Sequence, residues 1–224
     1  MEKISYAKTV YGQDEIDAVV KCLNESTQMG NYSRKFESKI AKLFDKDFCL
    51  YVNSGSSALY IGVESFNFPE GSEVITPALT FGTTISCLIK NKLVPVFVDV
   101  EPLSYCIDTA QIEEMITDKT VAILAPNLMG NICNWEKISE ISKKHGLIVI
   151  EDSADTLGGT INGKSSGYYS DMSITSFYGS HIINCAGNGG ALMLNDKNVV
   201  DKAKLLRSWG RSSSLFDEKS EAIE

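Results

Sequence analysis

The sequence lacks most of the residue patterns that mark metal and redox sites. Only two of its 224 residues are histidines, and its six cysteines are scattered without a C-x-x-C pair. The ligand spacings of a metal site are absent, so no metal is expected. Several cysteines lie within apolar runs, which predicts reduced and mostly buried thiols in a cytoplasmic protein.

A basic surface and a membrane segment are also absent. The formal net charge is −8 and no run of Lys and Arg could neutralise a phosphate backbone, so no nucleic-acid partner is expected. One phosphorylated small ligand is compatible with this charge, because it needs only a local site. No apolar stretch approaches the roughly 20 residues of a membrane span, and the N-terminus lacks the apolar core of a signal peptide.

Strand-like and helix-like runs alternate along the chain. Short apolar runs predict strands at 48–52, 73–77, 93–100, 121–126, 147–152, 172–175 and 191–194. Apolar residues at helical spacing predict helices at 14–24, 32–44, 58–66, 80–90, 112–116, 135–145 and 197–209. The alternation predicts an α/β fold with a mostly parallel sheet and helices on both faces.

The run 93–100 is largely apolar, as expected for a strand that is covered on both faces. Trp209 is predicted to lie on the apolar face of the last helix. The motif of one common α/β class is missing: no strand precedes G-x-G-x-x-G, which weakens a Rossmann site.

Polar residues follow three predicted strands at their carboxyl ends, where open α/β sheets bind ligands. Glu151 and Asp152 end one strand. A Ser/Gly turn at 53–58 leads from another strand into a helix, and a stretch rich in Ser, Gly and Asn at 176–190 holds His181 in its middle. Free amides and hydroxyls at such turns can bind a phosphate.

Each feature also has an ordinary structural explanation. Ser56 is a good N-cap for the helix after the Ser/Gly turn, and the glycines at 187–190 can serve a tight connection. Phe81, at the start of a predicted helix, could be a core residue. Asp152 could be part of a solvated strand end.

Four stretches together resemble the fold type I, pyridoxal-phosphate-dependent sugar aminotransferases and dehydratases of nucleotide-sugar biosynthesis. They occur in the order of that family and extend from Asn53 to Gly190. The matching pieces are Asn53-Ser-Gly-Ser-Ser-Ala-Leu59, Thr76-Pro-Ala-Leu-Thr-Phe81, Glu151-Asp-Ser-Ala-Asp155, and Ser176-Phe-Tyr-Gly-Ser-His181 with Gly189-Gly190.

The resemblance implies a role for each matched residue. Ser56, Ser57 and Ser176 would hold the phosphate of pyridoxal or pyridoxamine phosphate. Phe81 would stack on the pyridine ring, and Asp152 would pair with the ring nitrogen and keep it protonated, as an electron sink requires. Asp155 is expected in the cofactor site, at a position where many aminotransferases of the family have Gln or His.

His181 is the main departure from the aminotransferases, which have a lysine there that holds the cofactor covalently. The nearest lysines in sequence are Lys164 and Lys197. A histidine at this position resembles the sugar 3-dehydratases, in which it acts as an acid and base. The resemblance therefore implies removal of the C3 hydroxyl from a nucleotide-linked 4-keto-6-deoxyhexose, in deoxysugar and surface-polysaccharide synthesis.

The 3-dehydratases are of two sorts, and cysteines separate them. One sort needs an iron–sulfur cluster and several cysteines, whereas only Cys185 follows His181 here. The other sort regenerates its cofactor from glutamate, as in GDP-4-keto-6-deoxymannose 3-dehydratase, and this sort is expected. Two alternatives stay open: a sugar aminotransferase that uses another lysine, and a non-catalytic relative that binds the cofactor or a sugar nucleotide.

The resemblance also predicts the domain organisation. Residues 1–210 would form the cofactor-binding large domain with its N-terminal helices. Residues 211–224 would begin a crossing segment toward a small C-terminal domain that is missing from this chain. Members of the family pair as dimers that complete each other's sites, so a homodimer is expected.

Overall fold

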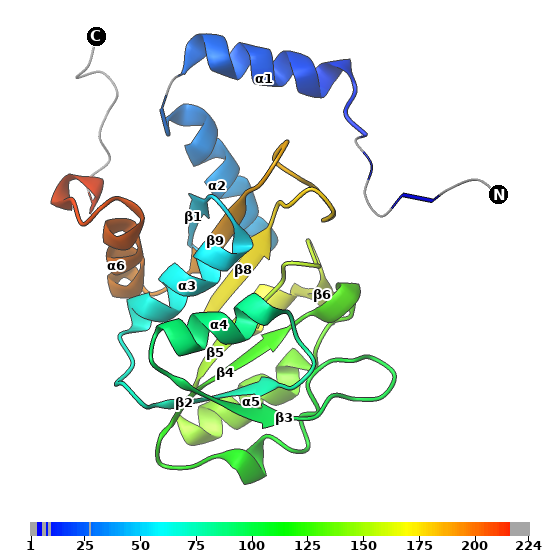
Figure 1. Ribbon diagram of the computed structural model, residues 1–224, viewed down its shortest axis with the longest axis vertical. Coiled ribbons are helices and arrows are strands. Elements are labelled where there is room, and N and C mark those ends of the chain that lie inside the picture. Colours follow the sequence, from blue (N-terminus) through cyan, green and yellow to red (C-terminus); the bar gives the residue numbers. More distant parts are fainter. Residues whose placement is uncertain (1–3, 6–7, 9, 27, 216–224) are drawn as a thin grey trace.

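The computed structural model describes residues 4–5, 8, 10–26 and 28–215, and it is built around a seven-stranded sheet (Figure 1). The strand order is β1-β9-β8-β5-β4-β2-β3. Only β9 runs against its neighbours β1 and β8, so the predicted mostly parallel sheet is confirmed. The strands are β1 Phe48–Val52, β2 Glu73–Pro77, β3 Val94–Val98, β4 Thr120–Pro126, β5 Ile148–Asp152, β8 Met172–Ser176 and β9 Gly190–Leu194.

Helices cover both faces of this sheet, as predicted. The α-helices are α1 Gln13–Glu25, α2 Asn31–Leu43, α3 Gly55–Phe66, α4 Gly82–Lys90, α5 Trp135–His145 and α6 Lys197–Arg207. Short 3-10 helices lie at Glu113–Met115, Leu128–Gly130, Ser166–Tyr169 and Ser212–Leu215, and a small ribbon pairs β6 (Thr160–Ile161) with β7 (Lys164–Ser165). The ribbon and three of these 3-10 helices are additions to the predicted pattern.

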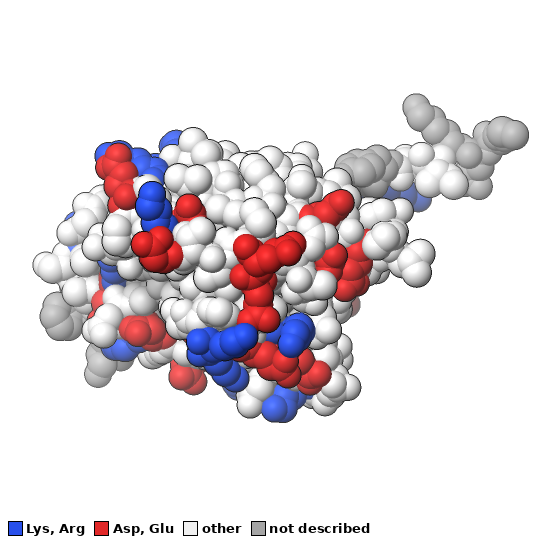
Figure 2. Space-filling view, turned by 90° about the horizontal axis from the view of Figure 1, so that it is seen from below, with Lys and Arg blue, Asp and Glu red and all other residues white. Residues whose placement is uncertain are grey.

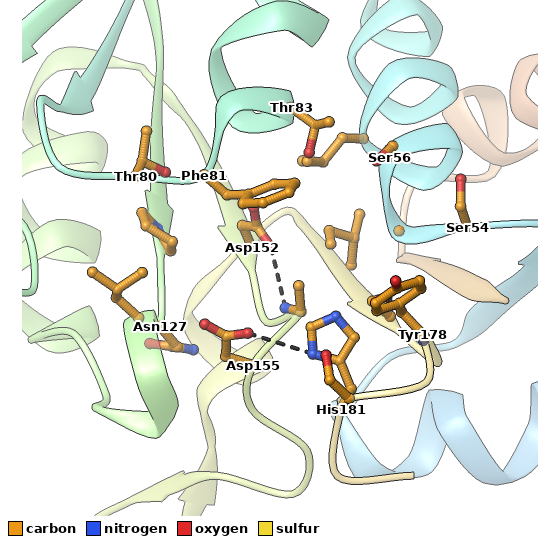
Figure 3. A pocket seen from close by; sticks show the side chains of 18 of the residues that line it. Ser54, Ser56, Thr80, Phe81, Thr83, Asn127, Asp152, Asp155, Tyr178 and His181 are labelled. Atoms are coloured by element: carbon orange, nitrogen blue, oxygen red, sulfur yellow. Dashed lines mark hydrogen bonds and ion pairs between the residues drawn. The ribbon is translucent and has the colours of Figure 1, made fainter. Parts of the chain in front are cut away.

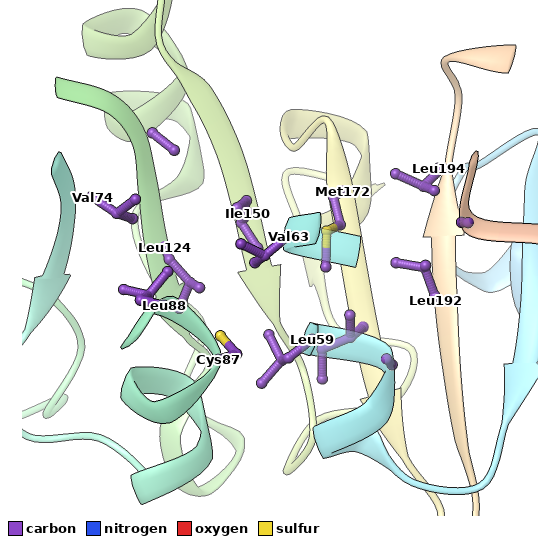
Figure 4. Packing of buried hydrophobic residues seen from close by; sticks show 14 of the residues in the cluster. Leu59, Val63, Val74, Cys87, Leu88, Leu124, Ile150, Met172, Leu192 and Leu194 are labelled. Carbon is purple, nitrogen blue, oxygen red and sulfur yellow. The ribbon is translucent and has the colours of Figure 1, made fainter. Parts of the chain in front are cut away.

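Alternate residues of the central strands pack into separate cores on the two faces. Leu124 and Ile150 join the core under α3, which Figure 4 shows from close by. Ile123 and Val149 join the core under α5. Because successive strand residues point to opposite faces, near-continuous apolar runs are what a sheet covered on both sides requires.

Local capping sets the ends of several helices. Asn134 accepts a hydrogen bond from the Lys137 amide at the start of α5, and Gly146 ends that helix with φ +68°. The left-handed conformation favours glycine, and the predicted end of this helix is confirmed. At α6, both the Asn198 and Val199 amides donate to the Asp196 carboxylate.

Three predicted details are wrong. The strand at 93–100 spans only Val94–Val98, and because β3 lies at the edge of the sheet, Val94 and Phe97 are 45% and 48% exposed. The helix predicted at 112–116 is a 3-10 turn. Trp209 follows the end of α6 with φ +59° and is 84% exposed, so it adds nothing to the apolar face of the helix.

Helix α1 stands apart from the sheet and buries none of its residues (Figure 1). Its apolar side chains Ile16, Val19, Val20 and Leu23 are half exposed or more. The charged side chains of both signs are intermixed on the face shown in Figure 2. None of the helices in the described part of the chain is long and apolar enough to span a membrane.

The predicted division into domains stays a prediction. The crossing segment predicted at 211–224 is described only to residue 215, and its remainder lies outside the described residues.

Candidate active site

Polar side chains from five strands meet in one cavity at the carboxyl edge of the sheet (Figure 3). The cavity has a volume of about 460 Å³. Its walls come from the segments that follow β1, β2, β4, β5 and β8, at 54–56, 79–83, 126–128, 152–155 and 176–181. The site was predicted at this edge from the sequence, and six of the seven predicted site residues line the cavity.

The Ser/Gly turn after β1 differs in detail from the prediction. The N-cap of α3 is Ser54, whose hydroxyl oxygen accepts a hydrogen bond from the Ser57 amide at 3.1 Å. The helix begins at Gly55, three residues before the predicted start, so Ser56 is a first-turn residue and not the cap. Ser54 and Ser56 line the cavity, whereas Ser57 bonds to Ser54 and is absent from the lining. Ser57 is therefore the predicted site residue that does not reach the cavity.

Close backbone packing fixes the position of this turn. A Cβ on Gly190 would lie 2.2 Å from the carbonyl carbon of Ser54, and a Cβ on Gly55 would lie 2.9 Å from the Cβ of Ser176. Only glycine permits these approaches. The end of β8 and the start of β9 therefore pack directly against the start of α3. This packing brings Ser56 and Ser176 to the same end of the cavity.

Phe81 is not a core residue. It is the N-cap residue of α4, its side chain is 69% exposed, and it lies at the cavity (Figure 3). The first amides of α4 start beside it, at the positively polarised end of the helix. An exposed aromatic ring in this place suits stacking on a flat ligand.

Asp152 is the most buried carboxylate that lines the cavity, with 5% exposure. The Thr84 hydroxyl donates to its Oδ2 at 2.9 Å, and the Ala154 amide donates to its Oδ1 at 3.1 Å. Burial raises the pKa of Asp152 to about 6, and the two hydrogen bonds oppose that rise. A cationic ligand group would favour the ionised form.

His181 and Asp155 form a pair across the cavity. The imidazole Nδ1 lies 3.4 Å from Oδ1 of Asp155, whose Oδ2 accepts a hydrogen bond from the Met129 amide at 3.1 Å. The His181 side chain is 19% exposed. Because Nδ1 faces the Asp155 carboxylate, Nε2 is the imidazole nitrogen that can interact with a ligand in the cavity.

Asn127 and Tyr178 line the cavity but were not predicted from the sequence. Asn127 lines the cavity and follows β4 at its carboxyl end, the same position that marked Asp152 on β5. Its amide group is used for structure: Nδ2 donates to Glu151 and Ser153, and Oδ1 accepts from Cys133 and Trp135. Tyr178 also lines the cavity, with its ring 6.1 Å from that of His181.

The sheet order, the reversed strand and the cavity together match the fold of the type I pyridoxal-phosphate enzymes. Residues 10–223 match the DegT/DnrJ/EryC1/StrS aminotransferase family, and the chain belongs to this family.

Individual relatives include both synthases and dehydratases. The chain is 33% identical over 212 residues to a GDP-perosamine synthase of Caulobacter vibrioides, covering 94% of this chain and 57% of the relative. It is 36% identical to a dTDP-4-dehydro-2,6-dideoxy-D-glucose 3-dehydratase of Saccharopolyspora spinosa, covering 88% and 44%. A crystal structure of GDP-4-keto-6-deoxymannose-3-dehydratase with a trapped PLP-glutamate geminal diamine matches with a TM-score of 0.90 and 28% identity, covering 96% and 57%.

These comparisons fix the family and leave the reaction open. The chain spans about half the length of the curated relatives it matches. Family members carry out aminotransfer and 3-dehydration on nucleotide sugars, and similarity alone does not separate the two reactions.

Proposed function

We propose that this chain is the cofactor-binding part of a pyridoxamine-phosphate-dependent 3-dehydratase acting on a nucleotide-linked 4-keto-6-deoxyhexose. The observation that carries the proposal is that His181 lines the cavity. The resemblance to the family implies that its position corresponds to that of the aminotransferase lysine. The described residues that line the cavity include no lysine. A cofactor held here would be free of a covalent link to the chain.

The cavity fits the proposed cofactor. Ser56 and Ser176, with the first amides of α3, would hold the phosphate at the end where Gly55 and Gly190 bring the strands close. The ring would stack on Phe81 with its nitrogen toward Asp152. Bound there, pyridoxamine phosphate would supply an amine for the C4 ketone and a protonated ring that withdraws electrons.

His181 would move the protons of the reaction. Asp155 faces Nδ1 of the imidazole, so Nε2 is the nitrogen that would take up and release a proton within the cavity. The same nitrogen would deliver a proton to the C3 hydroxyl as it leaves. Asp155 would orient the ring, a use that differs from the cofactor contact implied by the resemblance.

The partners are part of the proposal. The proposed amine donor is glutamate, as in the cluster-free sort of dehydratase that the resemblance favours. The exposed apolar face of α1 supports a homodimer, because four large apolar side chains there are without cover in the described chain. The proposed enzyme is cytoplasmic, which the free cysteines of the described chain support.

The rival aminotransferase would need a lysine from elsewhere, and the non-catalytic relative would have no need of Asp152. The decisive assay uses the protein at its full natural length with pyridoxal phosphate, glutamate and GDP-4-keto-6-deoxymannose. We expect loss of the C3 oxygen from the sugar together with released ammonia, and the His181→Ala variant should lose this reaction. An amino sugar as product would contradict the proposal in favour of aminotransfer. Full turnover by the alanine variant would remove His181 from the mechanism.

A further inference from the structure

The carboxylate of Asp152 is held from two different elements. Its Oδ1 accepts from the Ala154 amide, within the turn that follows β5. Its Oδ2 accepts from the Thr84 hydroxyl, which comes from α4, 68 residues away in the sequence. One donor to each oxygen fixes the plane of the carboxylate. The Ala154 contact follows from the local turn, whereas the Thr84 contact depends on how α4 docks on the sheet.

The Thr84 hydroxyl donates its hydrogen bond outside its own helix. Threonine in a helix commonly bonds back to a carbonyl of the preceding turn. Thr84 is the third residue of α4, its side chain is fully buried at 0% exposure, and its hydroxyl reaches out of the helix to Asp152. Because the Thr84 side chain is buried, its hydroxyl depends on a protein acceptor, and that acceptor is the Asp152 carboxylate.

We propose that Thr84 is a positioning residue that orients Asp152 and keeps it ionised for the ring nitrogen of the cofactor. The inference rests on the proposed function for the identity of the ligand, and on geometry alone for the hold on Asp152. Thr84 does not line the cavity and would touch neither cofactor nor substrate. It acts through Asp152.

Few other groups around Asp152 favour the ionised form of its carboxylate. On α4, Cys87 lies near Asp152, and burial followed by Asp152 itself raises the pKa of its thiol to about 12, so the thiol stays neutral. Glu151 on β5 and Asp155 after β5 are carboxylates that oppose ionisation of Asp152. His181, from the segment after β8, pairs with Asp155. The described cavity lining includes no Lys or Arg, so the Thr84 hydroxyl and the Ala154 amide are the dipoles that act against burial.

The test follows the carboxyl group directly, without cofactor. Carbon-13 labelling of aspartate allows NMR to record the titration of Asp152 in the free protein, with the signal assigned by Asp152→Asn. In Thr84→Val, which fills the same space without a donor, the titration midpoint should rise by about one pH unit. Thr84→Ser keeps the hydroxyl and should keep the midpoint. If Thr84→Val does not fold, Thr84→Ala replaces it and should show the same rise.

A second readout links Asp152 to the cofactor. Affinity for pyridoxamine phosphate is measured against pH in the same variants. We expect Thr84→Val to weaken binding by about tenfold at pH values below both midpoints, by about threefold midway between them, and to approach the wild-type affinity at higher pH, since one pKa unit corresponds to a tenfold change in the ionised fraction. A merely structural effect would weaken binding equally at every pH.

The outcomes separate this inference from the proposed function. An Asp152 midpoint that is the same in Thr84→Val and Thr84→Ser would overturn the role of Thr84, whatever the enzyme does. Suppose that the Asp152 midpoint shifts in Thr84→Val while the affinity for pyridoxamine phosphate does not depend on pH. The role of Thr84 in orienting Asp152 would then stand, but the contact of Asp152 with the cofactor, and with it the cofactor assignment, would be refuted.

Discussion

Two adjacent carboxylates at the end of β5 serve different purposes. Glu151 is completely buried on the α5 face, where it accepts hydrogen bonds from Ser173, Ser153 and Asn127. Asp152 is on the α4 face, accepts two hydrogen bonds and lines the cavity. Glu151 is satisfied by its own chain, whereas Asp152 has capacity for a ligand.

The difference shows how one strand end can build both structure and a site. The donors around Glu151 tie it to β8 and, through Asn127, to the end of β4. The Asn127 amide also donates to the Asp152 carbonyl. The strand that presents Asp152 is thereby anchored from its opposite face. A buried carboxylate with fewer partners and an elevated pKa marks the functional member of the pair.

Replacing Asp152 should have the largest effect on function. Asp152→Asn removes the negative charge that would face the ring nitrogen, so we expect turnover of the proposed reaction to fall by about 10²- to 10³-fold. Steady-state assay of the sugar product measures it. Activity within twofold of wild type would show that the ring nitrogen has no charged partner here.

The same change should stabilise the protein at neutral pH. The pKa of Asp152 is raised from 3.8 to about 6, so the folded form binds its proton more tightly than the unfolded chain does. Wild-type stability should therefore fall as the pH rises from about 4 to about 6, by roughly 2 to 3 kcal/mol. Asp152→Asn should lack this fall, which denaturant unfolding across that pH range would detect.

Replacing Glu151 should destabilise the protein, whereas replacing Asp152 should stabilise it. Glu151→Gln presents an amide to three groups that donate hydrogen bonds, so we expect a loss of about 2 to 4 kcal/mol in unfolding free energy. Glu70→Gln is the matched control, because Glu70 pairs with Lys92 at an exposed site and should change stability by less than about 1 kcal/mol. Equal effects in the two variants would refute the structural role of Glu151.

Glycine packing at the phosphate end offers a further test. The added Cβ of Gly190→Ala would meet the backbone at Ser54, so we expect a loss of about 1 to 3 kcal/mol and weaker cofactor binding. Gly179→Ala is the control within the same connection, because no heavy atom lies within 4 Å of its added Cβ. Calorimetry and equilibrium dialysis report the two effects.

The smallest expected effect concerns the helix cap. Ser54→Ala should cost about 1 kcal/mol, because it removes the acceptor for the Ser57 amide. Ser56→Ala should change stability little and should reduce affinity for the cofactor phosphate. The reverse ranking in thermal unfolding would restore Ser56 as the cap.

Much of the fold follows from patterns that are local in sequence. The apolar runs ending at Val52, Pro77 and Asp152 predicted strands with the correct ends, and Gly146 marked the end of α5. The position of a strand within the sheet and its direction depend on residues that are distant in sequence. The exposure of β3 at the sheet edge and the reversed direction of β9 were therefore not predicted. The end of α6 before Trp209 likewise depends on a positive φ that the helical spacing did not signal.

The site was predictable to the extent that strand ends reveal it. Asp152 and His181 were found because polar residues or a Ser/Gly/Asn-rich stretch follow apolar strands, whereas Asp155 and the role of Ser176 came from the family resemblance. Thr84 was missed because a threonine within an apolar helix carries no signal until α4 is docked on β5. The pairing of Asp155 with His181 joins two loops, and spacing alone could not show it.

The central claim is that His181 replaces the lysine that tethers the cofactor. The most direct measurement first establishes binding of pyridoxal phosphate to the chain by equilibrium dialysis, then treats the complex with borohydride and weighs the intact protein. We predict an unchanged protein mass for the wild type and a mass increased by the cofactor for His181→Lys, with the label on the peptide that contains position 181. A wild-type protein that keeps the reduced cofactor on one of its own lysines would contradict the claim and favour an aminotransferase.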